Sequence, residues 1–173
     1  VQLPTVVRNI PQFRPPMVHE LSELRGSMGL QPGRVAFIYQ GGFIAGRGVE
    51  RLLKIFAELP HLDLVCMGSG PLQPLVAQAA QVHTNIHLIP PVLPQEVLGY
   101  TQAADVVICL TDNSCLSHYY SLPNKIFEYL HAGLPIIVNP LLEQKKMVEQ
   151  YGCGWVALED DGAFAAMLAA VDR

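Results

Sequence analysis

The sequence predicts an α/β domain with a Rossmann-like, six-stranded parallel sheet and helices on both faces. Short apolar or β-branched runs alternate with amphipathic stretches, which is the pattern of repeated strand–helix units. Glycine and proline stand singly at the junctions between these runs. At 173 residues, half of them hydrophobic, the chain is long enough for one ordinary core.

The elements are expected in strict alternation along the chain. Strands are predicted at 35–39, 62–67, 86–88, 106–109, 135–138 and 154–157. Helices are predicted at 47–58, 72–81, 95–103, 124–131, 142–150 and 162–171. Right-handed crossovers would place these helices alternately on the two faces of the sheet.

The first 32 residues follow a different pattern. Pro4, Pro11, Pro15, Pro16 and Pro32 interrupt them and leave one predicted helix at 18–28. We therefore expect a linker with a first helix over 1–32 and the α/β domain over 33–173. Because such a linker seldom opens an independent protein and the first residue is not Met, the chain is expected to be a piece of a longer one.

Composition argues against several other functions. The formal net charge is −4 and no Lys/Arg cluster alternates with aromatic residues, so no nucleic-acid partner is expected. No apolar run approaches the roughly 20 residues of a membrane-spanning helix, which leaves at most peripheral membrane association through a longer protein. Cys66, Cys109, Cys115 and Cys153 lack metal-ligand spacing and are interpreted as buried free thiols, with a Cys115–Cys153 disulfide as the alternative. Free thiols favour a cytoplasmic location.

The first candidate site follows the first predicted strand, because ligands of open parallel sheets bind beyond the carboxyl ends of strands. Residues 40–48 read Gln-Gly-Gly-Phe-Ile-Ala-Gly-Arg-Gly. Gly41 and Gly42 would let the backbone approach a phosphate, and Arg47, in the first turn of the next helix, would pair with it. An ordinary turn with a solvated arginine explains the pattern equally well, since it fits neither the dinucleotide fingerprint nor the Walker motif. A second Gly-x-Gly, at Gly68, is more typical of a tight turn.

The most informative stretch is 121–135, Ser-Leu-Pro-Asn-Lys-Ile-Phe-Glu-Tyr-Leu-His-Ala-Gly-Leu-Pro. Pro123 and Asn124 would open a helix on which Lys125 and Glu128, three residues apart, are surface neighbours. A phosphate at the helix amino terminus would take Lys125 as counter-ion, and the Glu128 carboxylate would accept two hydrogen bonds from a ribose diol. The alternative is a plain Lys125–Glu128 ion pair worth a few tenths of a kcal/mol.

Together these segments resemble the carboxyl-terminal, donor-binding domain of retaining GT-B glycosyltransferases of family four. The likeness covers nearly the whole chain and is most specific at 123–135. It implies that Glu128 holds the ribose hydroxyls and that Arg47 is the phosphate-binding cation after the glycine loop. It also implies that the donor diphosphate contacts Gly41, Gly42, Leu122, Pro123, Asn124 and Lys125. Contacts to the base or the sugar would come from Gly68, Pro91, Val92 and His118.

Two positions depart from the family pattern. Many members carry two glutamates separated by seven residues, whereas Tyr120 stands at the first of these positions when counted back from Glu128. An arginine usually follows the glycine loop closely, whereas Gly42 and Phe43 occupy that neighbourhood here. Donor binding is therefore expected to be weaker or arranged differently.

The resemblance implies a domain that binds a nucleotide-diphosphate sugar and serves hexose transfer to a glycan or lipid-linked acceptor in polysaccharide biosynthesis. The amino-terminal acceptor domain would be absent, so the isolated chain would be inactive. No Asp-x-Asp motif or His cluster indicates a metal, and no cofactor or catalytic residue is assigned. Two alternatives stay open: a domain of a sugar-nucleotide epimerase, whose catalytic carboxylates would lie in the other half, and a non-enzymatic α/β binding module.

Overall fold

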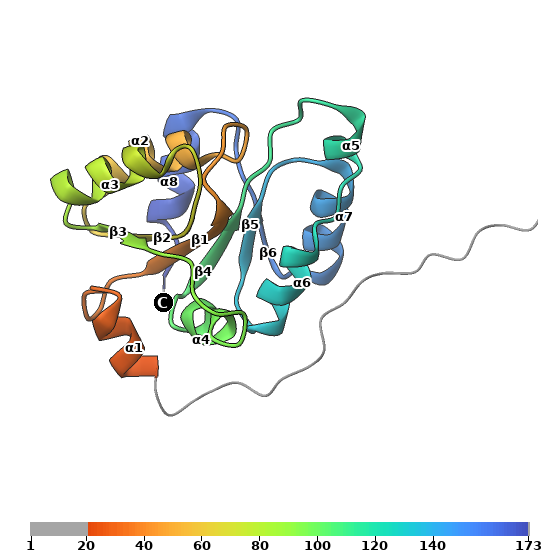
Figure 1. Cartoon of the computed structure of the whole chain (residues 1–173). Coiled ribbons are helices and arrows are strands. Elements are labelled where there is room, and N and C mark those ends of the chain that lie inside the picture. Colours follow the sequence, from red (N-terminus) through yellow and green to blue (C-terminus); the bar gives the residue numbers. More distant parts are fainter. Residues whose placement is uncertain (1–20, 173) are drawn as a thin grey trace, which may run out of the picture.

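A twisted, open sheet forms the centre of the domain in the computed structural model, which describes residues 21–172 (Figure 1). Its strand order is β3-β2-β1-β4-β5-β6, and every neighbouring pair is parallel. The strands are β1 (Ala36–Gly42), β2 (Asp63–Ser69), β3 (Ile86–Ile89), β4 (Val106–Cys109), β5 (Ile136–Val138) and β6 (Gly154–Val156). The predicted fold class and all six predicted strands are confirmed, with 106–109 correct at both ends and the other strand ends differing by at most three residues.

The helices follow the predicted alternation with two differences. They are α1 (Leu21–Ser27), α2 (Val49–Ala57), α3 (Gln73–Val82), α4 (Val97–Gln102), α5 (Leu116–Tyr119), α6 (Asn124–His131), α7 (Leu142–Tyr151) and α8 (Asp161–Ala169). Helix α2 begins two residues later than predicted, because Gly48 has a left-handed backbone with φ of 75°. Helix α5 was not predicted. The part of the predicted linker at 1–20 lies outside the described residues.

The helices are grouped on the two faces and do not alternate, which corrects the prediction. Side chains of α2, α3 and α8 join one core cluster, and those of α4, α6 and α7 pack on the other. Strands β1, β2 and β3 follow one another in one direction across the sheet, and β4, β5 and β6 follow in the other. Because right-handed crossovers change face when that direction reverses, α2 and α3 lie on one face and α6 and α7 on the other, and α8, which follows the last strand, packs on the face of α2 and α3.

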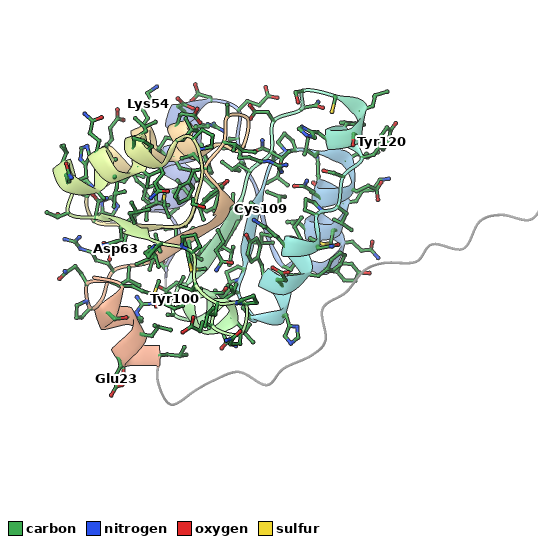
Figure 2. The ribbon with its side chains drawn as sticks, viewed as in Figure 1. Glu23, Lys54, Asp63, Tyr100, Cys109 and Tyr120 are labelled. Carbon is green, nitrogen blue, oxygen red and sulfur yellow. The ribbon has the colours of Figure 1, made fainter. Side chains whose placement is uncertain are left out.

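Ion pairs occupy the amino-terminal edge of the sheet. The Asp105 carboxylate accepts a hydrogen bond from the Ala36 amide at 2.8 Å and pairs with Arg25 of α1 at 3.2 Å. Asp63, whose side chain is fully buried, lies 3.5 Å from Arg34 and 3.3 Å from the His87 ring (Figure 2). These pairs compensate charges that burial would otherwise penalise, and they tie α1 and the segment after it to the sheet.

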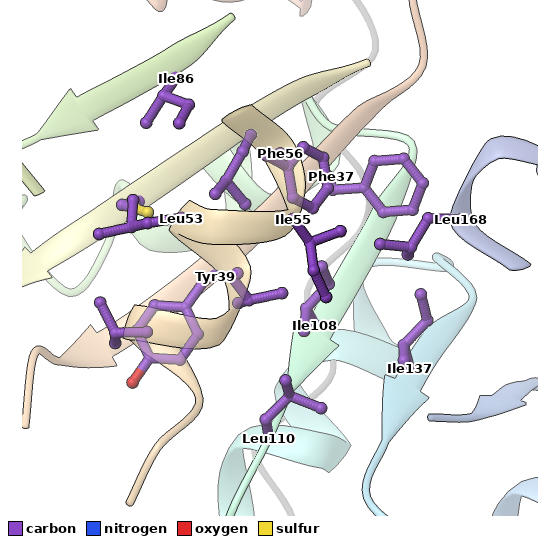
Figure 3. Packing of buried hydrophobic residues seen from close by; sticks show 14 of the residues in the cluster. Phe37, Tyr39, Leu53, Ile55, Phe56, Ile86, Ile108, Leu110, Ile137 and Leu168 are labelled. Carbon is purple, nitrogen blue, oxygen red and sulfur yellow. The ribbon is translucent and has the colours of Figure 1, made fainter. Parts of the chain in front are cut away.

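Apolar side chains alternate between the two faces of each central strand, as the period of two requires. Phe37 and Ile108 point to the face covered by α2 and α8, where Phe37 packs edge-to-face on Phe56 with ring centroids 5.3 Å apart (Figure 3). Their neighbours Ile38 and Val107 are fully buried on the opposite face. Two cores therefore hold the sheet rigid up to the carboxyl ends of its strands.

All four cysteines are free, so the alternative Cys115–Cys153 disulfide does not form in this structure. Cys66 and Cys109 are buried as predicted, but Cys115 is exposed because it precedes the surface helix α5. Burial raises the pKa of the Cys66 thiol to about 12. None of the helices within residues 21–172 has the length and apolar character needed to cross a membrane.

These environments predict selective alkylation of the folded protein by iodoacetamide at pH 7.5. Thiolate is the reactive form, so Cys115 should be labelled quickly, whereas Cys66 should react only after unfolding because its raised pKa and burial both suppress attack. Peptide mass spectrometry with and without denaturant measures both rates. Equal labelling of Cys66 and Cys115 in the native protein would contradict the burial described here.

Candidate functional site

A pocket of about 290 Å³ opens where the strand order reverses, between β1 and β4. In doubly wound sheets the connections on either side of this point diverge, and the gap between them is the usual ligand site. The carboxyl ends of β1 and β4 and the beginning of α6 form its walls. We call it the switch-point pocket, and it is lined by Tyr39, Gln40, Gly42, Ile44, Arg47, Ile108, Cys109, Leu110, Thr111, Pro123, Asn124, Lys125 and Tyr129.

Two cations enter the switch-point pocket from different walls. Arg47, in the loop after β1, donates to the Thr111 hydroxyl at 3.1 Å, and Lys125 of α6 donates to the Gln40 carbonyl at 3.1 Å. Neither cation forms an ion pair with another residue of the described range 21–172, and no Asp or Glu lines the pocket. The geometry therefore leaves two positive charges without an internal counter-ion, which is the arrangement expected of an anion site.

The two cations act on the same buried thiol. Cys109, labelled in Figure 2, lines the pocket. Burial raises the pKa of its thiol to about 11, while the positive charges of Lys125 and Arg47 lower it. Both charges therefore lie close enough to Cys109 to stabilise a negative charge within the switch-point pocket.

The glycines predicted as a turn form the last residues of β1. Gly41 and Gly42 pair with Gly68 and Ser69 of β2 in regular parallel register. Gly68 has φ of 150°, and a Cβ built on it would overlap the Gly41 carbonyl oxygen. Close approach between two strand ends therefore explains Gly68, which does not line the switch-point pocket.

Hydrogen bonds to both neighbouring loops hold the loop after β1 in place. The Phe43 amide donates to the Ser69 carbonyl at 2.9 Å, and the Asp112 amide donates to the Gly46 carbonyl at 2.9 Å. Together with the Arg47–Thr111 contact, these bonds fix the loop across the end of β4. The Arg47 side chain therefore extends from a loop. The prediction that Arg47 lies in the first turn of a helix was wrong, because α2 begins only at Val49.

Helix α6 begins at Asn124 after Pro123, whose missing N–H costs nothing at that position. Ile126 and Tyr129 are buried against the sheet, which leaves Lys125 and Glu128 on the exposed side. The Lys125–Glu128 ion pair, the alternative interpretation of this pattern, is absent among the described residues, because the lysine extends to the end of β1. Lys125 therefore lies in the first turn of α6, as predicted, and its ammonium is directed to the end of β1.

The structure brings together only part of the predicted site. Of the residues expected at a diphosphate, Gly42, Arg47, Pro123, Asn124 and Lys125 line the switch-point pocket. Gly41 lies directly beneath the Lys125 ammonium. Leu122 packs against a core cluster and does not line the pocket.

The remaining predicted residues lie outside the switch-point pocket. Glu128 is exposed on α6. Pro91 and Val92 follow β3, the edge strand, two strands away from β1. His118 of α5 accepts from or donates to Ser114 Oγ at 3.0 Å and lies 2.9 Å from the Asp112 carbonyl.

Sequence reasoning missed the other lining residues: Tyr39, Gln40, Ile44, Ile108, Cys109, Leu110, Thr111 and Tyr129. Thr111 could have been predicted from the sequence, because it is the first residue with a hydroxyl group after the carboxyl end of an apolar strand. The tyrosines carried none, because a buried aromatic residue in a strand or helix is most often part of the core. Within residues 21–172 no group of three or more His, Cys, Asp or Glu could hold a metal ion.

An open parallel sheet with a pocket at the point where its strand order reverses defines a doubly wound, Rossmann-like domain. Residues 34–172 match the family described as glycosyl transferases group 1, and the chain belongs to that family. A search of curated protein sequences finds no match.

Solved glycosyltransferase structures share this fold. WaaG, described as a glycosyltransferase involved in lipopolysaccharide biosynthesis, matches with a TM-score of 0.68 at 19% identity over 88% of this chain and 41% of its own. HepE of Anabaena, in complex with UDP and glucose, matches with a TM-score of 0.69 at 15% identity over 87% of this chain and 42% of its own. TarM of S. aureus, also with UDP, matches with a TM-score of 0.61 at 11% identity over 94% of this chain and 31% of its own.

The chain therefore spans about two-fifths of the length of the first two structures that it matches. The resemblance to one half of a GT-B glycosyltransferase, predicted from the sequence, is confirmed.

Proposed function

We propose that this chain is the donor-binding domain of a retaining glycosyltransferase and that it binds a nucleotide-diphosphate hexose for transfer to a glycan or lipid-linked acceptor. The observation that carries the proposal is the switch-point pocket, where Arg47 and Lys125 face a space without any carboxylate. A diphosphate is a ligand with two adjacent anionic groups, which suits two separate cations. The solved structures of HepE contain UDP with glucose or UDP-glucose, and they support the same ligand class here.

The proposed chemistry is electrostatic. When the bond between the anomeric carbon and the β-phosphate oxygen breaks, the electron pair stays on the departing diphosphate and its negative charge grows. Arg47 and Lys125, together with the amides at the start of α6, would stabilise that charge more strongly in the transition state than in the bound donor. The acceptor and its proton acceptor would belong to the amino-terminal acceptor domain of the full-length protein, so the isolated chain should bind donor but turn it over negligibly.

A ligand-observed NMR titration of the purified chain with UDP, GDP and ADP tests the proposal. One nucleotide should bind saturably, and Lys125→Ala should weaken that binding by about tenfold while the protein stays folded. Addition of EDTA should leave the affinity unchanged, since the proposed site uses protein cations in place of a divalent metal. Absence of binding by a folded chain to all three nucleotides would remove the donor-binding function and leave the fold alone.

The role proposed for Glu128 predicts a loss of selectivity between ribose and deoxyribose. Its exposed carboxylate would accept hydrogen bonds from both ribose hydroxyls, so Glu128→Ala should bind the nucleoside diphosphate about tenfold more weakly and should no longer prefer it over the 2′-deoxy form. Titrations with both nucleotides give the ratio directly. Glu143→Ala on α7, which also removes one exposed carboxylate, is the control and should keep the preference. A Glu128→Ala variant that keeps the same ratio would exclude the ribose contact.

A further inference from the structure

Three glycines lie at the carboxyl edge of β1 and β2, and a side chain would meet different surroundings at each of them. A Cβ on Gly42 would meet nothing closer than Ile44 at 3.9 Å. A Cβ on Gly68 would overlap the backbone of β1, at the Gly41 carbonyl oxygen. A Cβ on Gly41 would instead overlap the ammonium nitrogen of Lys125, which belongs to a helix far along the chain. Among these three positions, only Gly41 leaves room for a charged group of the pocket.

Lys125 reaches this position with a long, flexible side chain. Its ammonium crosses from α6 to the end of β1 and donates to the Gln40 carbonyl at 3.1 Å, directly above the Cα of Gly41. Because an ammonium has three donors and the Gln40 carbonyl uses one, further donors remain for a ligand in the switch-point pocket. The absence of a side chain on Gly41 thus leaves room for the Lys125 ammonium at the end of β1.

The two cations of the pocket are held at separate strand ends. Lys125 is held at the end of β1 by Gln40, and Arg47 is held beyond the end of β4 by Thr111. A ligand with two phosphoryl groups can pair with both cations, whereas a single phosphoryl group can satisfy one cation while leaving the other to solvent. The separation of the two cations therefore favours a diphosphate over a monophosphate.

We propose that Gly41 is a positioning residue that acts through Lys125, and that it determines the preference of the switch-point pocket for a diphosphate over a monophosphate. This inference rests on the proposed donor-binding function. A side chain at position 41 would displace the ammonium from the end of β1, so the second phosphoryl group would lose its cation while the Arg47 contact remained. The selectivity between the two anions should therefore fall even though both cations are still present in the sequence.

Inorganic pyrophosphate and orthophosphate test the inference without reference to any base or sugar. Their affinities for the full chain should be measured by ³¹P NMR for the wild type and for Gly41→Ala, Lys125→Met, the double variant Gly41→Ala/Lys125→Met and the control Gly26→Ala. Gly41→Ala should weaken pyrophosphate binding by about tenfold and change orthophosphate binding by less than about threefold. Lys125→Met should do the same, and adding Gly41→Ala to it should cause no further loss, because the residue through which Gly41 acts is already gone. Gly26→Ala, in α1 and outside the switch-point pocket, should keep wild-type affinities for both anions, because a Cβ there would meet nothing within 4 Å.

Two results would overturn the inference. One is a Gly41→Ala loss that adds in full to the Lys125→Met loss, and the other is a Gly41→Ala loss of the same size for pyrophosphate and for orthophosphate. The nucleotide titrations separate this failure from failure of the donor-binding function: a pyrophosphate preference that depends on Gly41 in a chain that binds no nucleotide would retain the inference and remove that function.

Thermal unfolding covers the case in which Gly41→Ala folds poorly. Gly41 has φ of 135°, so alanine is strained there in any background. The contact with Lys125 adds little, because the ammonium at the end of a flexible side chain can move aside. Gly41→Ala should therefore lower Tm by about the same amount in the wild type and in the Lys125→Ala background, and the affinities are compared at temperatures well below these Tm values. A clearly larger decrease in the wild type would show that the alanine does not displace the ammonium, which would contradict the inference.

Discussion

Gly68→Ala is expected to destabilise the domain by about 3 kcal/mol or more, a large share of the stability of an ordinary domain. The alanine methyl would overlap the Gly41 carbonyl oxygen of the neighbouring strand, and Gly68 has φ of 150°, which side-chain-bearing residues rarely adopt. Since both atoms that collide are attached to the backbone, no side-chain rotation relieves the contact. The ends of β1 and β2 must separate, and the loop that directs Arg47 would move with them.

Urea unfolding followed by circular dichroism measures this effect. Gly26→Ala is the matched control, because Gly26 lies within α1 and a Cβ there would meet nothing within 4 Å. Alanine at that helical position should raise stability by about 0.5–1 kcal/mol. A Gly68→Ala protein with a wild-type midpoint would mean that β1 and β2 are not paired as described.

The second large effect is expected when both pocket cations are removed. Each charge-assisted contact to a phosphate contributes about 1.5–3 kcal/mol, so Arg47→Met/Lys125→Met should weaken nucleoside-diphosphate binding by at least about 100-fold. Methionine keeps most of the apolar stem of both side chains and removes the charge. Folding should be little affected, because both groups lie at the pocket surface. Isothermal titration calorimetry with the best nucleotide of the panel gives the affinities.

A control must separate contact from overall charge. Lys145→Met/Lys146→Met on α7 removes the same two positive charges from side chains that are 50% and 60% exposed and lie outside the switch-point pocket. This variant should bind within about twofold of the wild type, since surface charges act weakly through water. If both double variants lost affinity equally, the anion would be responding to net charge and the switch-point pocket would not be its site.

Most of the fold followed from local patterns in the sequence. Buried strands such as 106–109 are continuous apolar runs. The amphipathic segments between them connect parallel strands, and such connections are usually helices. Helix α5 was not predicted, because it has only four residues and none of them is buried, so the sequence shows no helical repeat of apolar residues there. The grouping of helices on the two faces was missed because it depends on strand order, which no local pattern records.

The site was predictable only where charge or backbone chemistry marked it. Arg47 and Lys125 stood out as cations beside glycine or at a helix start, and the structure brings them to one pocket. Tyr39 and Tyr129 are indistinguishable from core residues in the sequence, and their place in the pocket follows from the adjacency of β1 and β4. Glu128 was selected by its position on the predicted helix and by the family resemblance, and it lies outside the pocket lining, so the geometry of the pocket does not itself support the ribose contact.

The unequal distribution of charge also affects how fast an anion arrives. The chain as a whole is negative, with a formal net charge of −4, while the lining of the switch-point pocket contains two cations and no acid. An approaching diphosphate is thus repelled at long range and attracted once it is within a few ångströms of the pocket. The Debye length shortens from about 30 Å at 0.01 M salt to about 10 Å at 0.1 M, which screens the distant repulsion before the close attraction. Moderate ionic strength should therefore speed the encounter of this domain with its anion, the reverse of the usual behaviour of a protein whose overall charge is opposite to that of its ligand.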